Sequence, residues 1–241
     1  IGFQHHYGMY KITHESSQSN FIELMKSTGA QRSLPAIEAI FNPSMYAKRK
    51  VKDATKDMIV SSANNFYGEG VTQKIVEDYY SRIIDKNDPE PIEYGLNSTM
   101  ILKDGKAYED VWKIGGRYGK SLEKVNENLL QAIKYAENEP QRNALQKLTE
   151  YFKTGDLKLW NEYNILWAHA TQGDIDYILG FIEVYGDAIG KRATYESVIQ
   201  INDFEASKQM AVVAANAQWF EDNSSIKPEH KKKKVLYLKI I

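Results

Sequence analysis

The sequence predicts an α+β protein in which helices predominate and β-structure is a small part. Apolar residues recur at helical spacing over most of the chain, whereas strand-like patterns are confined to 92–112, 175–201 and the last residues, 235–241. The composition agrees, because 42% hydrophobic and 26% charged residues are ordinary for a globular protein. With 241 residues, the chain is also long enough to bury a sizeable core.

Helix signals mark seven segments of the chain. Thr72 is a favourable N-cap residue, and Pro140 and Gly155 stand where a helix characteristically begins and ends. The predicted helices cover residues 21–25, 34–41, 72–84, 117–135, 140–155 and 156–170, and one long element covers 203–220.

Two strand–turn–strand units are predicted among these helices. Asp104-Gly105 is a strong hairpin turn signal, and it lies between extended segments at 100–102 and 106–108. Over 175–201 an apolar run, a Gly-Asp turn and an alternating segment also predict strand, turn and strand. Residues 61–70 and 223–234 are small or polar and are expected to be loops. The apolar residues 235–241 are expected to begin a further strand.

Charge and composition restrict the partners and the compartment. The 31 basic and 32 acidic residues give a net charge of −1, which argues against nucleic-acid and membrane partners. Four consecutive lysines at 231–234 are interpreted as a solvated loop. The sequence holds 0 cysteines, which excludes disulfides and thiolate metal sites and fits a reducing cytoplasm. No signal peptide opens the sequence, and a cytoplasmic location is expected.

The common catalytic motifs of hydrolases and nucleotide-binding proteins do not occur. The five histidines form no HExxH, and there is no GxSxG nucleophile elbow. Gly115-Gly116 precedes a predicted helix without the remainder of a phosphate-binding loop, so we interpret it as a simple turn. The sequence therefore predicts no metal site of its own.

A carboxylate and a phenol stand close together in the segment Phe181-Ile182-Glu183-Val184-Tyr185. If this segment is extended, Glu183 and Tyr185 point to one face of the strand. A glutamate can bind a ligand ammonium group, and a tyrosine hydroxyl can donate to a carbonyl oxygen. From the residues alone, an exposed polar strand face is the better explanation of the pattern.

The run from Gly180 to Gly190, GFIEVYGDAIG, resembles the G-F-x-E-x-Y-x-D-x-x-G segment of the dipeptidyl peptidase III family, and Glu196 follows it. Further similar phrases span almost the whole chain in the family's order and are closest to its Bacteroides-like bacterial branch. They are GFQHHYG at 2–8, NPSMYAKR at 42–49, SSANNFYGEGVTQ at 61–73, EYGLNS at 93–98, DGKAYEDVWKIGG at 104–116 and NAQWFED at 216–222.

The resemblance implies a function, which is zinc-dependent removal of dipeptides from the N-terminus of short peptides. It implies that Glu183 binds the free amino group of the substrate. It also assigns Tyr185 to substrate binding and to support of the scissile carbonyl and the oxyanion. Asp187 and Gly190 match the turn that follows and are interpreted as structural.

The family's zinc motif, HExxGH, and its EExRAD-like segment are both missing from this sequence. The resemblance therefore implies an internal fragment in which the zinc ligands are elsewhere and which is inactive alone. We expect residues 1–202 to form most of the lobe opposite zinc, a helix over 203–222 to cross toward the zinc lobe, and 223–241 to be a connector and the start of a strand.

Two other interpretations compete with the peptidase. A non-catalytic peptide-binding module would bind peptides without zinc dependence, and tyrosine- and tryptophan-bearing helices would suit it. Relatives in this branch are sometimes named dihydrofolate reductase, but the sequence has no nucleotide-binding glycine pattern to support NADPH binding.

Overall fold

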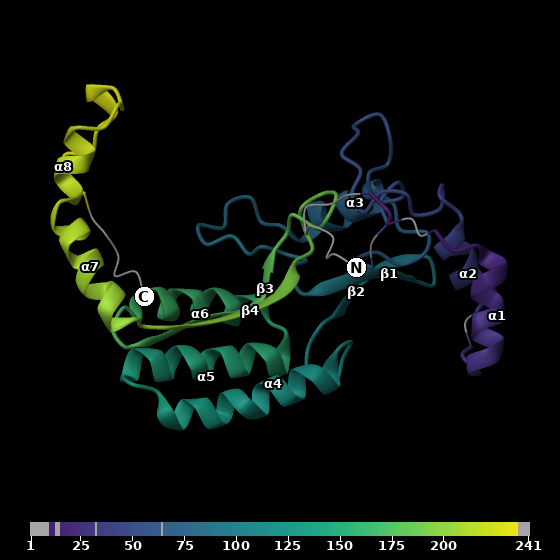
Figure 1. Cartoon of the computed structure of the whole chain (residues 1–241), viewed down its shortest axis with the longest axis horizontal. Helices are drawn as coiled ribbons and strands as arrows, with labels where there is room; N and C mark the ends of the chain where they lie inside the picture. Colours follow the sequence, from purple (N-terminus) through teal and green to yellow (C-terminus); the bar gives the residue numbers. More distant parts are fainter. Residues whose placement is uncertain (1–9, 13–14, 32, 64, 236–241) are drawn as a thin grey trace. The chain divides into compact units, whose positions relative to one another are not determined.

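The computed structural model describes residues 10–12, 15–31, 33–63 and 65–235. These residues divide into two compact units (Figure 1). The first unit is built from Ile1–Trp112 and Phe181–Thr194, and the second from Lys113–Gly180 and Tyr195–Ile241. Helices outweigh two small antiparallel sheets, so the predicted α+β class is confirmed.

The described part of the residues up to Trp112 in the first unit forms helices and a hairpin. The helices are α1 (Gln18–Thr28), α2 (Leu34–Phe41) and α3 (Gln73–Ile83), and the strands are β1 (Ser98–Lys103) and β2 (Lys106–Val111). Asp104 and Gly105 join the strands with φ of 50° and 73°, as a two-residue hairpin turn requires. The predicted hairpin is therefore confirmed. Thr72 caps α3 as expected, because its side chain accepts from the Ile75 amide at 3.3 Å.

The core of the first unit lies where α3 packs on this hairpin. It is formed by the buried residues Ile59, Val71, Val76, Tyr80 and Met100. Met100 is 0% exposed and Val76 is 1% exposed, and burying one such side chain stabilises a fold by about 1.5–3 kcal/mol. The loop before α3 also pairs with β1, since the Gly68 amide donates to the Met100 carbonyl at 2.8 Å and the Met100 amide to the Phe66 carbonyl at 3.1 Å. This pairing fixes the position of Tyr67 on the outer edge of the hairpin.

Helices α4 (Gly119–Ala132), α5 (Glu139–Thr154) and α6 (Leu157–His169) pack side by side in the second unit, with α5 in contact with both neighbours (Figure 1). A 3₁₀ turn, η1 (Ile133–Tyr135), extends α4. The left-handed residue Gly155 ends α5 with φ of 72°. The apolar face of α5 supplies much of the core, including Ala144, Leu148 and Phe152.

A second antiparallel pair consists of β3 (Ile175–Glu183) and β4 (Thr194–Ile201). The 181–194 part of this hairpin belongs to the first unit and the rest to the second. The strand–turn–strand prediction for 175–201 is confirmed. The division into a lobe over 1–202, a crossing helix over 203–222 and a connector over 223–241 stays a prediction.

The prediction of one long helix over 203–220 is wrong. Two helices stand there, α7 (Phe204–Ala215) and α8 (Ala217–Asp222), and they are separated at Asn216. Asn216 has φ of −102° and ψ of 9°, and its amide donates to the carbonyls of Ala214 and Val213 instead of the i−4 carbonyl. Its side-chain amide donates to the Val212 carbonyl at 2.8 Å, a local bond with which asparagine competes against helix continuation.

After α8, the described residues to 235 are irregular apart from one 3₁₀ turn, η2 (Pro228–His230). Residues 223–234, including the four lysines, therefore form the loop expected from their polar composition. The predicted strand at 235–241 lies, beyond Val235, outside the described residues. Across the described ranges, no helix has the length and hydropathy needed to cross a bilayer.

Candidate functional site

Glu183 is the last residue of β3 and is half-buried. Its backbone carbonyl accepts from the Thr194 hydroxyl at 3.2 Å, which ties the strand end to the start of β4. Within the described part of the chain, the Glu183 carboxylate forms no salt bridge and accepts no hydrogen bond from another side chain. The carboxylate is thus available to a cationic ligand group.

Tyr185 lies beyond the strand, in the turn formed by residues 184–187. The prediction that Glu183 and Tyr185 share one strand is therefore wrong. The strand ends because the Asp187 amide donates to the Val184 carbonyl at 3.0 Å, which reverses the chain. The Tyr185 ring is 37% exposed, and its backbone carbonyl accepts from the Lys50 ammonium group. The turn therefore has a fixed backbone and an accessible ring.

Asp187, interpreted from the sequence as structural, is the hydrogen-bond centre of this turn. It is 1% exposed, and its Oδ2 accepts from the backbone amides of Lys191 at 2.7 Å and Arg192 at 3.0 Å. The Tyr67 hydroxyl donates to the same oxygen at 2.8 Å. Burial, followed by the charge of Asp187, raises the pKa of the Tyr67 phenol well above its ordinary range, so the hydroxyl keeps its proton and remains a donor.

Arg192 is the residue that the sequence analysis missed. It is 0% exposed, and its Nη1 donates to the Gly95 carbonyl at 3.0 Å, the Ser98 hydroxyl at 2.6 Å and the Glu109 carboxylate at 3.0 Å. Nothing in the sequence distinguishes it from a surface arginine. The one feature that could have drawn attention to Arg192 is its position, two residues after the end of the GFIEVYGDAIG run.

The rings of Tyr67 and Tyr80 also lie against the Arg192 guanidinium, with centroids 5.3 and 5.4 Å away. The Arg192 Nε and Nη2 are buried and, among the described residues, have no hydrogen-bond acceptor. The aromatic faces therefore compensate part of the desolvation of this charge.

Glycine is required at position 180, the first residue of the matched GFIEVYGDAIG run, by its contact with Trp160 in the second unit. Its φ is 149°, and a Cβ at this position would lie 2.5 Å from a carbon of the Trp160 ring. Trp160 itself stacks between Tyr151 and Tyr163, at centroid distances of 5.0 and 5.1 Å. Only glycine allows the strand to pass this close to the ring.

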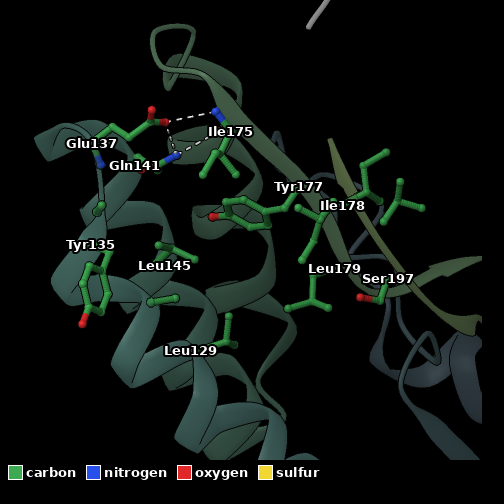
Figure 2. A pocket seen from close by; sticks show the side chains of 14 residues that line it. Leu129, Tyr135, Glu137, Gln141, Leu145, Ile175, Tyr177, Ile178, Leu179 and Ser197 are labelled. Carbon is green, nitrogen blue, oxygen red and sulfur yellow. Dashed lines mark hydrogen bonds between the residues drawn. The ribbon is translucent and has the colours of Figure 1, made fainter. Parts of the chain in front are cut away.

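The second unit also contains a mostly apolar recess of about 220 Å³ (Figure 2). The side chains that line it come from the end of α4, the start of α5 and both strands of the second hairpin; they include Leu129, Leu145, Tyr177, Ile178 and Val198.

At the rim of this recess, Glu137 and Gln141 are already bonded to the chain itself (Figure 2). Glu137 accepts from the Ile175 amide at 3.1 Å, and the Gln141 side chain donates to the Ile175 carbonyl at 3.0 Å. The polar groups of Glu137 and Gln141 are therefore already used in contacts with β3.

No group of three or more histidine, aspartate or glutamate residues in the described ranges is arranged to hold a metal ion. His169 ends α6 and His230 ends η2, whereas His5, His6 and His14 lie outside the described residues. The residues that the structure describes thus do not fit a zinc site.

Residues 71–222, more than half of the chain, match the family model of Peptidase family M49. The chain belongs to this family. The matched range includes Glu183, Tyr185 and the Asp187–Arg192 loop, and the resemblance stated from the sequence is confirmed at the family level.

Curated relatives of this M49 chain carry the name Dipeptidyl peptidase 3. The protein of Dictyostelium discoideum is 31% identical over 105 residues, which are 44% of this chain and 15% of that protein. The protein of Nematostella vectensis is 30% identical over 103 residues, which are 43% of this chain and 14% of that protein.

The M49 chain also resembles a solved structure titled DPP III from Caldithrix abyssi, with a TM-score of 0.55 and 18% identity. This match covers 89% of the chain and 41% of the solved one, and it shows a shared fold. The chain therefore spans less than half of that structure and a smaller part of the curated relatives.

Proposed function

We propose that the chain is the substrate-binding part of a dipeptidyl peptidase III-like exopeptidase, which removes dipeptides from the N-terminus of short peptides. In this proposal Glu183 binds the free amino group of the peptide and the Tyr185 hydroxyl donates to the scissile carbonyl oxygen. The observation that carries it is the Glu183 carboxylate at the end of β3, which has no side-chain partner among the described residues and stands two residues before the exposed Tyr185, inside the M49 match.

The chemistry of these two groups suits an exopeptidase. A carboxylate that pairs with an ammonium group favours peptides with a free N-terminus over blocked ones. A phenol hydroxyl that donates to a carbonyl oxygen bonds more strongly as negative charge develops on that oxygen. The chain thus contributes substrate orientation and oxyanion support.

Zinc dependence is part of the same proposal, since the sequence resembles a zinc peptidase family. The described residues do not fit a zinc site, so the metal ligands are assigned to residues that this sequence does not contain, and no step is derived through the metal. The chain alone is proposed to be inactive. A cytoplasmic location is also proposed, because a sequence with 0 cysteines suits a reducing compartment.

The test is calorimetric binding of one tetrapeptide in two forms, free and N-acetylated, to the purified chain. The free form is expected to bind tighter, and Glu183→Gln should remove this preference, with a loss of about tenfold or more for the free form only. Glu69→Gln, at an exposed glutamate of the same unit, is the matched control. Equal affinity of the wild-type chain for both forms would refute the ammonium role.

Catalysis is tested with a dipeptidyl-arylamide substrate and added zinc chloride. The chain alone should release no arylamine, and turnover by it would overturn the assignment of the metal ligands elsewhere. In a complete M49 enzyme that carries this segment, Tyr185→Phe should lower kcat by about 10²-fold. Binding without any turnover in that complete enzyme would instead support the non-catalytic peptide-binding module.

A further inference from the structure

The turn that carries Tyr185 has little backbone support of its own. Strand β3 ends at Glu183, and the bond from the Asp187 amide to the Val184 carbonyl, at 3.0 Å, closes the turn. A single turn bond leaves a loop free to sample other conformations. Contacts from surrounding side chains must therefore stabilise the Tyr185 turn.

One carboxylate oxygen joins this turn to a distant part of the chain. Asp187 Oδ2 accepts from the Lys191 and Arg192 amides and from the hydroxyl of Tyr67, which lies 120 residues earlier in the sequence. Tyr67 is itself held at the edge of β1 by the two backbone bonds between 66–68 and Met100. The turn is thus anchored to the hairpin through the Tyr67–Asp187 bond.

Arg192 provides the second anchor on the same side. Its backbone amide binds Asp187, and its guanidinium binds Ser98 and Glu109, one residue from each strand of the hairpin. Gly95 leaves room for this guanidinium, because a Cβ there would lie 2.7 Å from Nη1. The loop after the turn cannot shift without breaking these buried bonds.

The side chains of Lys50 and Arg49 also lie close to the backbone of the turn. The Lys50 ammonium group donates to the Tyr185 carbonyl, and a guanidinium nitrogen of Arg49 lies 3.6 Å from where a Cβ of Gly186 would be. The turn is thus bonded both through Asp187 and at the Tyr185 carbonyl, while Tyr185 stays 37% exposed. Such an arrangement leaves the ring accessible on a backbone that is fixed in advance.

We propose that Tyr67 and Arg192 are positioning residues which act through Asp187 to hold the turn at 184–187 in the one conformation that presents the Tyr185 hydroxyl to a peptide substrate. The substrate part of this proposal rests on the proposed function. The mechanical part, that the anchors order the turn, does not depend on it. The two parts have separate measurements.

The test uses the whole chain and Tyr67→Phe, which removes the hydroxyl bond to Asp187 and keeps the ring beside Arg192. Tyr94→Phe is the matched control, because Tyr94 packs against the same core and its hydroxyl forms no hydrogen bond with a described residue. Hydrogen–deuterium exchange is measured for the peptide that covers 184–190 and, as an internal reference, for α5. Tetrapeptide affinity is measured on the same samples by calorimetry.

In Tyr67→Phe, exchange over 184–190 should become about tenfold faster, as loss of one buried hydrogen bond allows, with α5 unchanged. Tetrapeptide affinity should fall by a similar factor, and Tyr94→Phe should change neither quantity. Asp187→Asn, which keeps the size of the side chain, should reproduce both effects. Unchanged exchange in Tyr67→Phe and Asp187→Asn would overturn the mechanical part.

Faster exchange with unchanged peptide affinity would overturn the positioning of substrate contacts. If the wild-type chain binds no tetrapeptide, the proposed function fails, and with it the substrate part. The exchange data still decide in that case whether the Tyr67–Asp187 bond orders the turn.

Discussion

Arg192 and Glu109 form an ion pair in which the nitrogen and oxygen lie 3.0 Å apart and the arginine side chain is 0% exposed. Oε1 of Glu109 also accepts from the hydroxyls of Tyr80 and Ser98, so three donors converge on this one oxygen. The pair connects the loop after the Tyr185 turn to β2. It therefore contributes both to the stability of the first unit and to the order of the candidate site.

Arg192→Met should destabilise the chain by about 3–5 kcal/mol, because it removes one partner of a buried pair and leaves the other charge uncompensated. The measurement is urea unfolding followed by circular dichroism. Arg142→Met is the control, since its pair with Glu139 has side chains 34% and 71% exposed and is worth about 1 kcal/mol or less. If both variants lose the same free energy of unfolding, burial does not make the Arg192 pair more important for stability than the exposed pair.

Gly180→Ala should destabilise the second unit by about 2–5 kcal/mol. The cost arises because φ is 149° and the new Cβ would lie 2.5 Å from the Trp160 ring, which is packed among other aromatic rings. Urea unfolding, followed by intrinsic tryptophan fluorescence, reports the change. Gly105→Ala, with φ of 73° and open space around it, should cost only about 1–2 kcal/mol. A neutral Gly180→Ala would mean that the strand does not pass so close to the ring.

Asn216→Ala is expected to join α7 and α8 into the continuous helix that the hydrophobic pattern suggests. Alanine removes the side-chain bond to the Val212 carbonyl and has the higher helix propensity, by roughly 0.5 kcal/mol. Ellipticity at the helix band should increase. Asn128→Ala is the control, because Asn128 makes the same type of bond, to the Lys124 carbonyl, inside the unbroken helix α4. The same gain in both variants would locate the cause of the break elsewhere.

Alkaline pH should unfold the chain through its buried phenols. Burial is the largest cause that raises the pKa of Tyr67, Tyr80, Tyr163 and Tyr177 above the ordinary value of 10.0. Folded phenols stay protonated where unfolded ones ionise, so the stabilisation is complete below about pH 10 and is lost as the pH rises above it. Melting temperatures measured from pH 8 upward should fall beyond that point.

Two phenylalanine variants isolate this effect. Tyr163→Phe removes one buried phenol and should make the alkaline decline shallower. Tyr135→Phe, at a ring that is 83% exposed, should leave the decline unchanged. Identical declines in the wild type and Tyr163→Phe would contradict the role of burial at this site.

Local signals in the sequence predicted most elements because those elements depend on local chemistry. The Asp104-Gly105 turn, the Thr72 cap and the Gly155 end of α5 each follow from the backbone preferences of one or two residues, and all three stand in the structure. The break at Asn216 was not predicted, since its apolar neighbours continue the helical pattern and one polar side chain decides against it.

The candidate site was predictable only in part. Motif resemblance selected Glu183 and Tyr185, but periodicity placed both on one strand, and the turn closed by Asp187 separates them. Local sequence patterns could not predict the role of Arg192, because its partners Gly95, Ser98 and Glu109 are 83 to 97 residues away.

The sequence by itself determined the α+β class, the family and the two residues of the proposed substrate contact, because these follow from short-range patterns and matched motifs. The tertiary structure alone decided that Asp187 and Arg192 anchor the Tyr185 turn to the first hairpin. The physical reason is that a buried charge is tolerated only where several distant partners converge on it, and that convergence exists only in the folded chain.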